Sequence, residues 1–440
     1  MSKPIQRLVH CFTLLMALTL ASCSGNSLEP SDSSTETNSS NDTKAAETPK
    51  APPAKKDASP SEPVPSQLLS QKELEQGWIQ LFDGQSLFGW NSNNKEVTWA
   101  VKEGVITADS DKAGLLVTTV PFADFELKCD FRMAKGANSG IFLRSVFKPT
   151  DPTKDCYELN ICNTNTKFPT GSFVGRKVVD NVNGEGEWMT YHIRCEGPTI
   201  YVRLNGEEVV EFTDDGRKAP VLTSGHIGLQ KNEGKIEFKN VLLRPINTTS
   251  LFNGDDLAGW KTVPGGKSEF SVVDGAIHAS NGPGFLETES THDDFILQFD
   301  AKINGEGLNS GVFFRAIQGT EEAPSNGYEF QVQNGFKDGD RSQPEDSGSG
   351  AIFRRVKARW VIANDNEWFA GTLIAHDLHF ASWINGIQVI DWTDDREPNE
   401  NPRRGARTKA GHFSLQGHDP TTDLDFRNLR IADFKIAPAQ

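Results

Sequence analysis

The 440-residue chain lacks an excess of positive charge: 45 lysines and arginines stand against 60 aspartates and glutamates, a formal net charge of −15. A protein that binds nucleic acid needs a basic patch to neutralise phosphates, so the composition argues against nucleic acid as a partner. The chain also lacks the GxSxG, Walker and HExxH motifs. Their absence weakens the case for an esterase, a nucleotide-binding enzyme or a zinc peptidase.

Cysteine is scarce, with six residues, and none has the CxxC spacing of a metal site. Beyond Cys23, all the cysteines fall in the first half of the chain, at Cys129, Cys156, Cys162 and Cys195. In an oxidising compartment one or two disulfides would suit this pattern. Cys129 and Cys195 both fall on the apolar phase of an expected strand, so they are either a buried disulfide or two inert core thiols.

An apolar stretch at the N-terminus, residues 8–20, follows a positively charged start and is too short to span a bilayer comfortably. It indicates a signal peptide over residues 1–22 and therefore export. Its end, Leu20-Ala21-Ser22-Cys23, resembles a bacterial lipobox, in which Cys23 is lipidated; an ordinary secretory signal is the alternative. Because serine follows Cys23, the resemblance implies a lipid anchor in the outer membrane, facing the periplasm.

Residues 23–71 are Ser, Thr, Pro, Ala and Lys with almost no large apolar side chain. Such a segment cannot bury enough surface to offset its ordering entropy, which predicts a disordered tether. The rest of the chain is long enough for two domains that each bury a core, and we place them at residues 72–247 and 248–437.

These two segments repeat one another, and they are called the first and second repeat below. A repeat this long indicates two tandem domains, not a solenoid unit. The spacing between matched motifs grows along the chain. The matches are 81–84 with 251–254, 89–90 with 259–260, 138–140 with 309–311, 157–158 with 328–329, 187–188 with 367–368, 205–206 with 385–386, and 238–240 with 426–428.

Apolar and polar residues alternate through both repeats, the pattern of strands with one wet face. Asn205-Gly206 and Asn385-Gly386 each follow an apolar run and suit primed hairpin turns. No convincing amphipathic helix longer than a few turns is present. Many short strands at regular spacing predict an all-β fold in which each repeat is a double-sheet jelly roll.

One expected strand of each repeat has polar side chains on its outward face. In the second repeat Glu329, Gln331 and Gln333 share one parity and therefore one sheet face. Asn309 and Arg315 share a parity in the preceding strand, which predicts that Arg315 points toward the same surface. The first repeat supplies Asn138, Arg144, Glu158 and Asn160.

This stripe is either a solvated sheet face with cross-strand charge pairs or a binding surface. Its recurrence in both repeats favours a sugar-binding groove, since amide, carboxylate and arginine side chains on a curved sheet suit hydroxyl groups. The second repeat adds Arg354 in an insertion and a His418-Asp419 turn, which Gln416 precedes as Gln230 precedes the equivalent turn of the first repeat. His418 is either a surface residue, a base or a metal ligand, so a divalent metal ion is a candidate cofactor.

With these motifs, both copies closely resemble the 3-keto-disaccharide hydrolase domain family over nearly their whole length. The resemblance implies a concanavalin A-like lectin/glucanase jelly roll in each repeat. It also implies cleavage of glycosides or disaccharides whose ring carries a 3-keto group, by hydrolysis or by elimination followed by hydration. Oligosaccharide or glycoside substrates would be the partners, with membrane contact through the N-terminal lipid alone.

A ketone acidifies the neighbouring C–H, so a carboxylate or imidazole can remove that proton. In the second repeat we expect Glu329 or His418 to be the base, with Arg315 and Arg354 on the enolate oxygen. The expected substrate-binding residues are Asn309, Gln331, Gln333, Gln416 and Asp419, with Glu158, Asn138 and Arg144 in the first repeat.

The first repeat lacks the His-Asp turn. It is expected to be an accessory binding domain or an active site with a different preference. For the whole chain, the main alternative is a non-catalytic glycan-binding lipoprotein with two lectin-like modules. Ordinary glycoside hydrolysis by paired carboxylates is the third hypothesis.

Overall fold

The computed structural model describes residues 63–164, 167–180, 184–217, 219–324 and 326–434. The predicted signal peptide, Cys23 and most of the predicted tether lie outside these ranges. Within the ranges, every helix is too short and too polar to cross a bilayer.

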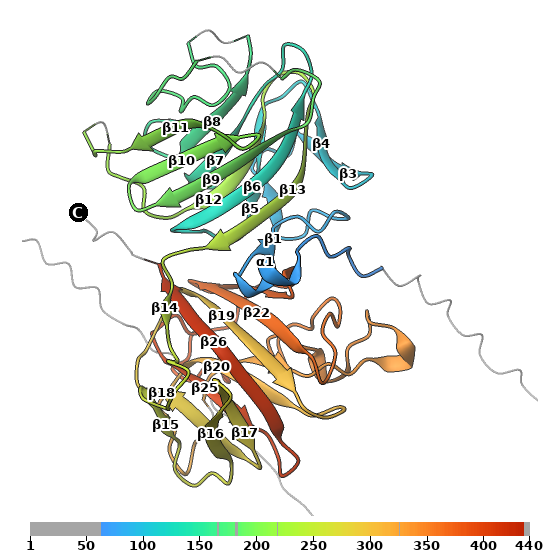
Figure 1. Ribbon diagram of the computed structural model, residues 1–440, viewed down its shortest axis with the longest axis vertical. Helices are drawn as coiled ribbons and strands as arrows, with labels where there is room; N and C mark the ends of the chain where they lie inside the picture. The colour runs from blue at the N-terminus through green and yellow to red at the C-terminus, as the bar shows by residue number, and fades with distance from the viewer. Residues whose placement is uncertain (1–62, 165–166, 181–183, 218, 325, 435–440) are drawn as a thin grey trace, which may run out of the picture. The chain divides into compact units, whose positions relative to one another are not determined.

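The first repeat consists of two antiparallel sheets (Figure 1). The eight-stranded sheet has the order β11-β10-β9-β6-β13-β4-β3, with β1 also paired to β13. Its strands are β1 (Ile79–Gln80), β3 (Thr98–Lys102), β4 (Val105–Asp109), β6 (Phe125–Met133), β9 (Met189–Glu196), β10 (Thr199–Leu204), β11 (Glu207–Thr213) and β13 (Ile236–Pro245). The five-stranded sheet, in order, contains β2 (Trp90–Ser92), β5 (Gly114–Thr118), β12 (His226–Lys231), β7 (Asn138–Ser145) and β8 (Tyr157–Cys162).

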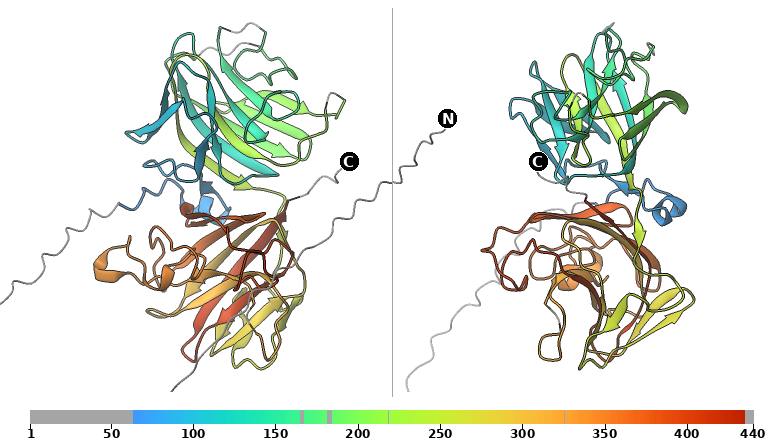
Figure 2. Two further views of the ribbon diagram at one scale, coloured as in Figure 1. Left: turned by 180° about the vertical axis from the view of Figure 1, so that it is seen from behind. Right: turned by 90° about the vertical axis from the view of Figure 1, so that its left-hand side faces the viewer.

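The second repeat has the same topology, strand for strand, and can be followed in the views of Figure 2. Its eight-stranded sheet, in order, contains β16 (Glu269–Val273), β17 (Ala276–Ser280), β26 (Asp423–Asp433), β19 (Phe295–Ile303), β22 (Trp368–His376), β23 (His379–Ile384) and β24 (Ile387–Thr393), with β14 (Thr249–Ser250) paired to β26. Its five-stranded sheet, in order, contains β15 (Trp260–Thr262), β18 (Gly284–Thr288), β25 (His412–Gly417), β20 (Ser310–Ala316) and β21 (Tyr328–Val332). The predicted pair of all-β jelly rolls is confirmed.

The alternation read from the sequence builds the core of each sandwich. On β19, Phe295, Leu297 and Phe299 are all buried. Phe299 meets Phe330 of the opposing sheet edge-on, with ring centroids 5.2 Å apart. A fully buried side chain of this size stabilises a fold by about 1.5–3 kcal/mol, so the two facing apolar layers are the main source of stability.

Both predicted hairpin turns are present. Asn205 and Gly206 have φ of 52° and 87°, and Asn385 and Gly386 have φ of 45° and 75°. Two successive positive φ values define the primed turn, whose twist matches that of the flanking strands.

The only α-helix among the described residues is α1 (Gln71–Glu75), which starts at a capping box between Ser70 and Glu73. Leu69 is buried in a small cluster with Leu74 and Trp78. Ordered packing therefore begins before residue 71, where the sequence placed the end of the tether. Two 3-10 turns, η1 (Lys337–Gly339) and η2 (Glu345–Ser347), lie in the insertion after β21.

The four described cysteines are free and buried, so the expected disulfides are absent among them. Cys195 lies opposite Phe125 and Cys129 lies opposite Tyr191, four residues apart along the same strand pair. Burial raises the pKa of the Cys195 thiol to about 12. Cys129 and Cys195 are therefore two inert core thiols and not a buried disulfide.

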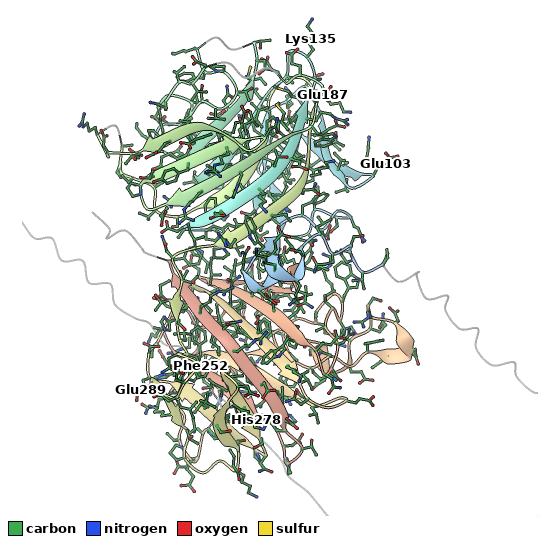
Figure 3. The ribbon with its side chains drawn as sticks, viewed as in Figure 1. Glu103, Lys135, Glu187, Phe252, His278 and Glu289 are labelled. Atoms are coloured by element: carbon green, nitrogen blue, oxygen red, sulfur yellow. The ribbon has the colours of Figure 1, made fainter. Side chains whose placement is uncertain are left out.

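The outward faces of the eight-stranded sheets are partly built from polar cross-strand pairs. His278 on β17, labelled in Figure 3, has its Nδ1 2.8 Å from Oδ1 of Asp425 on β26. Such a pair is the solvated structural use of polar residues on a strand.

Candidate active site

The outward face of the five-stranded sheet in the second repeat carries the polar stripe. Along β21, Phe330 and Val332 point into the core, while Glu329 and Gln331 point the other way. The later part of the insertion returns along β21: the Gly350 amide donates to the Gln331 carbonyl and the Phe353 amide to the Glu329 carbonyl, both at 2.9 Å. The expected parity of Glu329 and Gln331 is correct, but both side chains are buried.

Glu329 lies flat over a glycine of the neighbouring strand β20. A Cβ atom on Gly311 would lie 2.9 Å from Cγ of Glu329, closer than real contacts allow. Position 311 therefore needs glycine, because the Glu329 side chain occupies the space that a Cβ atom would fill. Glu329 is 6% exposed.

The electrostatic environment of Glu329 sets its proton affinity. Burial raises the pKa of Glu329 to about 7, against the opposing effect of Arg403, whose Nη2 lies 3.2 Å from Oε2. A carboxylic acid that titrates near neutrality is suited to take up and return a proton during a reaction.

A cavity opens beside Glu329, and its lining is rich in arginine. Arg354 and Arg403 line it together with Phe353. The Arg354 guanidinium lies over the Phe353 ring, 5.1 Å from its centroid. Within the described ranges the Arg354 guanidinium makes no hydrogen bond or ion pair, so its donors are available to a bound group.

Amide side chains link Glu329's strand to the His-Asp turn. Nε2 of Gln331 donates to Oδ1 of Asn309 at 2.7 Å, and Nδ2 of Asn309 donates to Oδ2 of Asp346 at 2.7 Å. Nδ2 of Asn309 also lies 3.5 Å from Nε2 of His418. The predicted residues Asn309, Gln331 and His418 are thus brought together.

The turn between β25 and β26 orients His418. Nδ1 of His418 lies 2.8 Å from Oδ2 of Asp419. The pKa of Asp419 falls to about 2, chiefly through the Thr421 hydroxyl and then through His418. An ionised Asp419 accepts a hydrogen bond from Nδ1–H of His418, which leaves Nε2 as the ring nitrogen that faces Asn309.

Three buried amide oxygens of the stripe lack a partner in the described part of the chain. They are Oε1 of Gln331, Gln333 and Gln416. Buried acceptors without a donor are costly, so such atoms indicate where ligand hydroxyls would donate.

Arg315 does not face this site, and the prediction that it does is wrong. The ladder between β20 and β25 shifts register between Phe313 and Ala316, and Arg315 has φ of 46°. This β-bulge rotates the side chain to the other side of the strand. The guanidinium is fully buried and donates at 2.5–2.8 Å to the carbonyls of Asp293, Asp377 and Arg407 and to the Asp294 carboxylate.

Arg144 repeats this arrangement in the first repeat, so its assignment to substrate binding is also wrong. It has φ of 48° and is buried. It donates to the carbonyls of Ala123, Gly197 and Leu222 and to the Asp124 carboxylate. Recurrence of this arginine reflects a structural clamp.

Sequence reasoning missed Arg403 and Asp346, which come from segments longer in the second repeat than in the first. Arg403 is held by the Arg355 guanidinium, which donates to its carbonyl at 2.7 Å. Asp346 belongs to η2. The growing spacing between matched motifs was the available signal that these segments differ.

The first repeat has a carboxylate equivalent to Glu329, but the residues around it differ. Glu158 lies beside Gly140, and burial raises its pKa to about 7, but its hydrogen-bond partner is Gln230, at 3.3 Å. Gly175 occupies the position equivalent to Arg354, as the matching bridges on either side show. Asn160 donates to the Phe168 carbonyl, and Asn138 pairs through its backbone with Glu233.

A metal ion was a candidate cofactor for His418. In the described part of the chain, no three His, Cys, Asp or Glu side chains are arranged to hold one.

Comparison with known proteins gives a consistent result in both repeats. Residues 77–244 and 247–432 each match the model of the 3-keto-alpha-glucoside-1,2-lyase-like domain. A 3-keto-disaccharide hydrolase from Bacteroides thetaiotaomicron is 29% identical over 169 residues, covering 31% of this chain and 58% of that protein. The chain thus spans under two thirds of this relative's length.

Among solved structures, two candidate glycosyl hydrolases from Parabacteroides distasonis are similar. One is 22% identical with a TM-score of 0.37, covering 41% of this chain and 99% of that one. The other is 29% identical with a TM-score of 0.34, covering 38% and 99%. The two family-model matches together span most of the chain, which therefore belongs to the 3-keto-alpha-glucoside-1,2-lyase-like domain family and contains that domain twice.

Proposed function

We propose that the second repeat cleaves glycosides whose sugar ring carries a ketone at C3, by elimination followed by hydration. One observation carries the proposal: a buried carboxylate, Glu329, has its pKa raised to about 7 and shares a cavity with Arg354 and Arg403. A base beside clustered cations fits the removal of a proton next to a carbonyl. Family membership supports the same substrate class.

In the first step the Glu329 carboxylate takes the proton from C2, which the C3 ketone acidifies. The C–H electron pair forms a C2–C3 double bond, and the negative charge moves to the C3 oxygen. Arg354 and Arg403 would donate to that oxygen, and charge-assisted hydrogen bonds to a developing anion are strong in a site that excludes water.

In the second step the enolate re-forms the ketone, a C1–C2 double bond appears, and the glycosidic C1–O bond breaks. The departing oxygen takes a proton from Nε2 of protonated His418. Asp419, 2.8 Å from Nδ1, stabilises the imidazolium before that transfer.

Water completes the reaction by adding across C1–C2. His418 takes a proton from the water as its oxygen bonds to C1, and Glu329 returns its proton to C2. Both groups recover their starting protonation states. The buried Oε1 atoms of Gln331 and Gln416 would accept hydrogen bonds from ring hydroxyls throughout.

The test uses the purified protein with a glucoside and with its 3-keto form, in H₂O and in D₂O. We expect release of the leaving group from the 3-keto form alone, with deuterium appearing at C2 of the early product above an enzyme-free control. Release from the unoxidised glucoside would favour ordinary hydrolysis by paired carboxylates. Binding of the 3-keto form without release would favour a glycan-binding role.

Arg403→Ala should shift the pH dependence of turnover. Proton removal needs ionised Glu329, so kcat/KM of the parent protein should fall as pH drops below about 7. Because Arg403 lowers the pKa of Glu329, the Arg403→Ala change should move the acidic limb of the pH profile to higher pH. It should also reduce kcat/KM at pH 7 by roughly 10- to 100-fold.

The exposed neighbour Arg404 provides a matched control in the same loop. Arg404→Ala should leave the pH profile where it is in the parent protein. If Arg403→Ala lowers turnover without moving the limb, Arg403 does not act on Glu329.

A further inference from the structure

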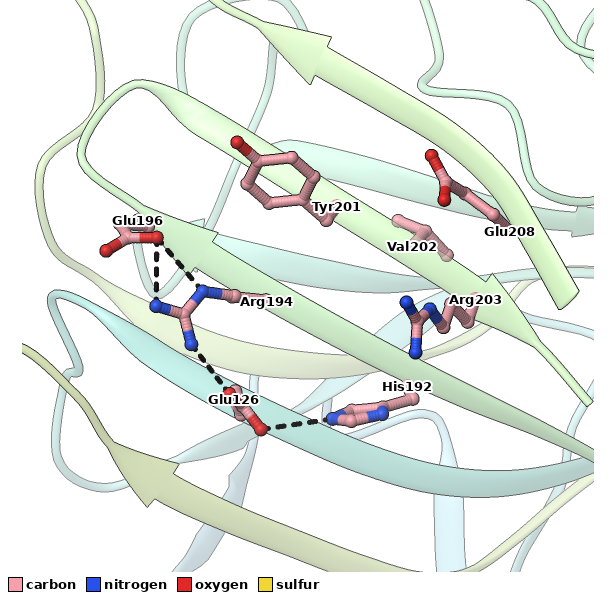
Figure 4. Close-up of a pocket in the computed structure, with 8 residues that line it drawn as sticks. All are labelled: Glu126, His192, Arg194, Glu196, Tyr201, Val202, Arg203 and Glu208. Atoms are coloured by element: carbon pink, nitrogen blue, oxygen red, sulfur yellow. Dashed lines mark hydrogen bonds and ion pairs between the residues drawn. The ribbon is translucent and has the colours of Figure 1, made fainter. Parts of the chain in front are cut away.

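A second cleft lies on the first repeat, on the outward face of its eight-stranded sheet. Its volume is about 400 Å³, within the range of roughly 300–1,000 Å³ usual for small-molecule sites. Its walls come from β6, β9, β10 and β11 (Figure 4). By contrast, the polar stripe around Glu329 lies on a five-stranded sheet, and so does its counterpart around Glu158.

The floor of the cleft is the carboxylate of Glu126, which its hydrogen-bond donors hold in place. Glu126 is 8% exposed and accepts hydrogen bonds from His192 at 3.2 Å, Arg194 at 2.7 Å and Arg244 at 2.8 Å. These partners, His192 first, hold the pKa of Glu126 down to about 2. Arg194 is fixed in turn by Glu196 at 2.9 Å. The donors and acceptors of the floor are therefore already oriented.

The wall on β10 has groups without such partners. Tyr201 is 37% exposed, and Arg203 is exposed beside it on the same face. Within the described ranges neither side chain makes a hydrogen bond or an ion pair. In Figure 4 the Tyr201 ring and the Arg203 guanidinium stand along the cleft, without dashed lines.

The fold does not require these residues, as the second repeat shows. Strand pairing places Thr372 at the position of His192, Ile374 at Arg194, Ala381 at Tyr201 and Trp383 at Arg203. All four of these second-repeat residues are buried. The corresponding face of the second repeat is thus largely apolar, whereas that of the first repeat is polar and contains the cleft.

We propose that the cleft on the first repeat binds a neutral saccharide. Three carboxylates line it, from Glu126, Glu196 and Glu208, against the two arginines Arg194 and Arg203. Arg244, bonded to Glu126, brings the arginines to three, so acidic and basic groups balance and the cleft has no net charge to attract an anionic ligand. Sugar hydroxyls can donate to the carboxylates and accept from the arginines in the same site.

The aromatic wall supplies the second half of sugar recognition. Tyr201 offers an exposed ring face against which the C–H groups of a sugar ring can pack, while oriented polar groups below bind its hydroxyls. The cleft contains no element of the proposed catalytic set. Its role would be to hold the chain on a glycan while the second repeat acts.

The intact chain can be titrated by calorimetry with glucose, galactose, maltose and cellobiose, and with glucuronate as the anionic probe. At least one neutral probe should bind, and glucuronate should bind more weakly. Tyr201→Ala and Arg203→Ala should each weaken binding of the neutral probe by about tenfold. Both residues are exposed, so circular dichroism should show an unchanged fold.

Two controls separate this cleft from the site of turnover. Phe147→Ala removes an equally exposed aromatic ring, 38% against 37%, and should not change binding. Tyr201→Ala should leave turnover of the 3-keto glucoside unchanged, and Glu329→Gln should leave binding at the cleft unchanged. Absence of binding by every neutral probe, unchanged affinity in the Tyr201→Ala and Arg203→Ala variants, or tighter binding of glucuronate would each overturn the proposal.

Discussion

Replacing Glu329 by glutamine should lower kcat on a 3-keto glucoside by about 10²- to 10⁴-fold, the range for loss of a general base. Glutamine has nearly the same shape, so it fits over Gly311 and can still accept from Arg403. The fold should therefore persist. Steady-state kinetics with the purified variant would measure the loss, and unchanged kcat would remove Glu329 from the mechanism.

The same substitution should stabilise the protein at alkaline pH. The folded-state pKa of Glu329 is raised from 4.5 to about 7, so its stabilising contribution is complete below pH 4.5 and is lost as pH rises through 7. Glutamine has no charge to desolvate. At pH 8 the free energy of unfolding of the variant should exceed that of the parent by up to about 3 kcal/mol. This difference should disappear toward pH 5.

Glu158→Gln is the matched control in the first repeat. The pKa of Glu158 is also raised to about 7 by burial, so this variant should show the same pH-dependent stabilisation. Turnover should be unchanged. If Glu158→Gln abolishes turnover and Glu329→Gln does not, catalysis resides in the first repeat.

Replacing Arg315 by methionine should destabilise the second repeat by about 3–5 kcal/mol, the cost of breaking a buried ion pair from one side. The change leaves the Asp294 carboxylate and three backbone carbonyls without their donor. Urea unfolding followed by tryptophan fluorescence would measure the shift. Arg144→Met should destabilise the first repeat by a similar amount.

Arg132→Met is the control for loss of an arginine. Arg132 pairs with Glu237 at 2.7 Å, but its side chain is 37% exposed. Exposed ion pairs contribute little to stability because water screens them, so the shift should be small. If Arg315→Met unfolds no more easily than Arg132→Met yet abolishes turnover, Arg315 belongs to the active site after all.

The sandwich architecture was predictable because its signals are local. Alternation along a strand decides which side chains enter the core, and Asn-Gly pairs at 205–206 and 385–386 decide where two hairpins turn. The same local rule correctly placed Glu329 and Gln331 on one face. It failed at Arg315, because counting parity assumes an unbroken ladder and a single bulge reverses the direction of the side chain.

The cations around Glu329 were only partly predictable. Arg354 was singled out from the insertion, but Arg403 lies 74 residues beyond Glu329 and reaches it from a loop. Loop conformation depends on tertiary contacts such as the Arg355 bond to the Arg403 carbonyl, which no local pattern encodes. Asp346 was missed for the same reason.

The segments that return along β21 and β8 also bear on self-association. Gly350 and Phe353 donate to carbonyls of β21, and in the first repeat Val174 donates to the Glu158 carbonyl of β8. These bonds occupy groups that an outermost strand would otherwise offer to a strand of another molecule. At the opposite margin, β2 and β15 have only three residues each. The five-stranded sheets of both repeats therefore offer little unpaired strand edge from which intermolecular β-structure could grow.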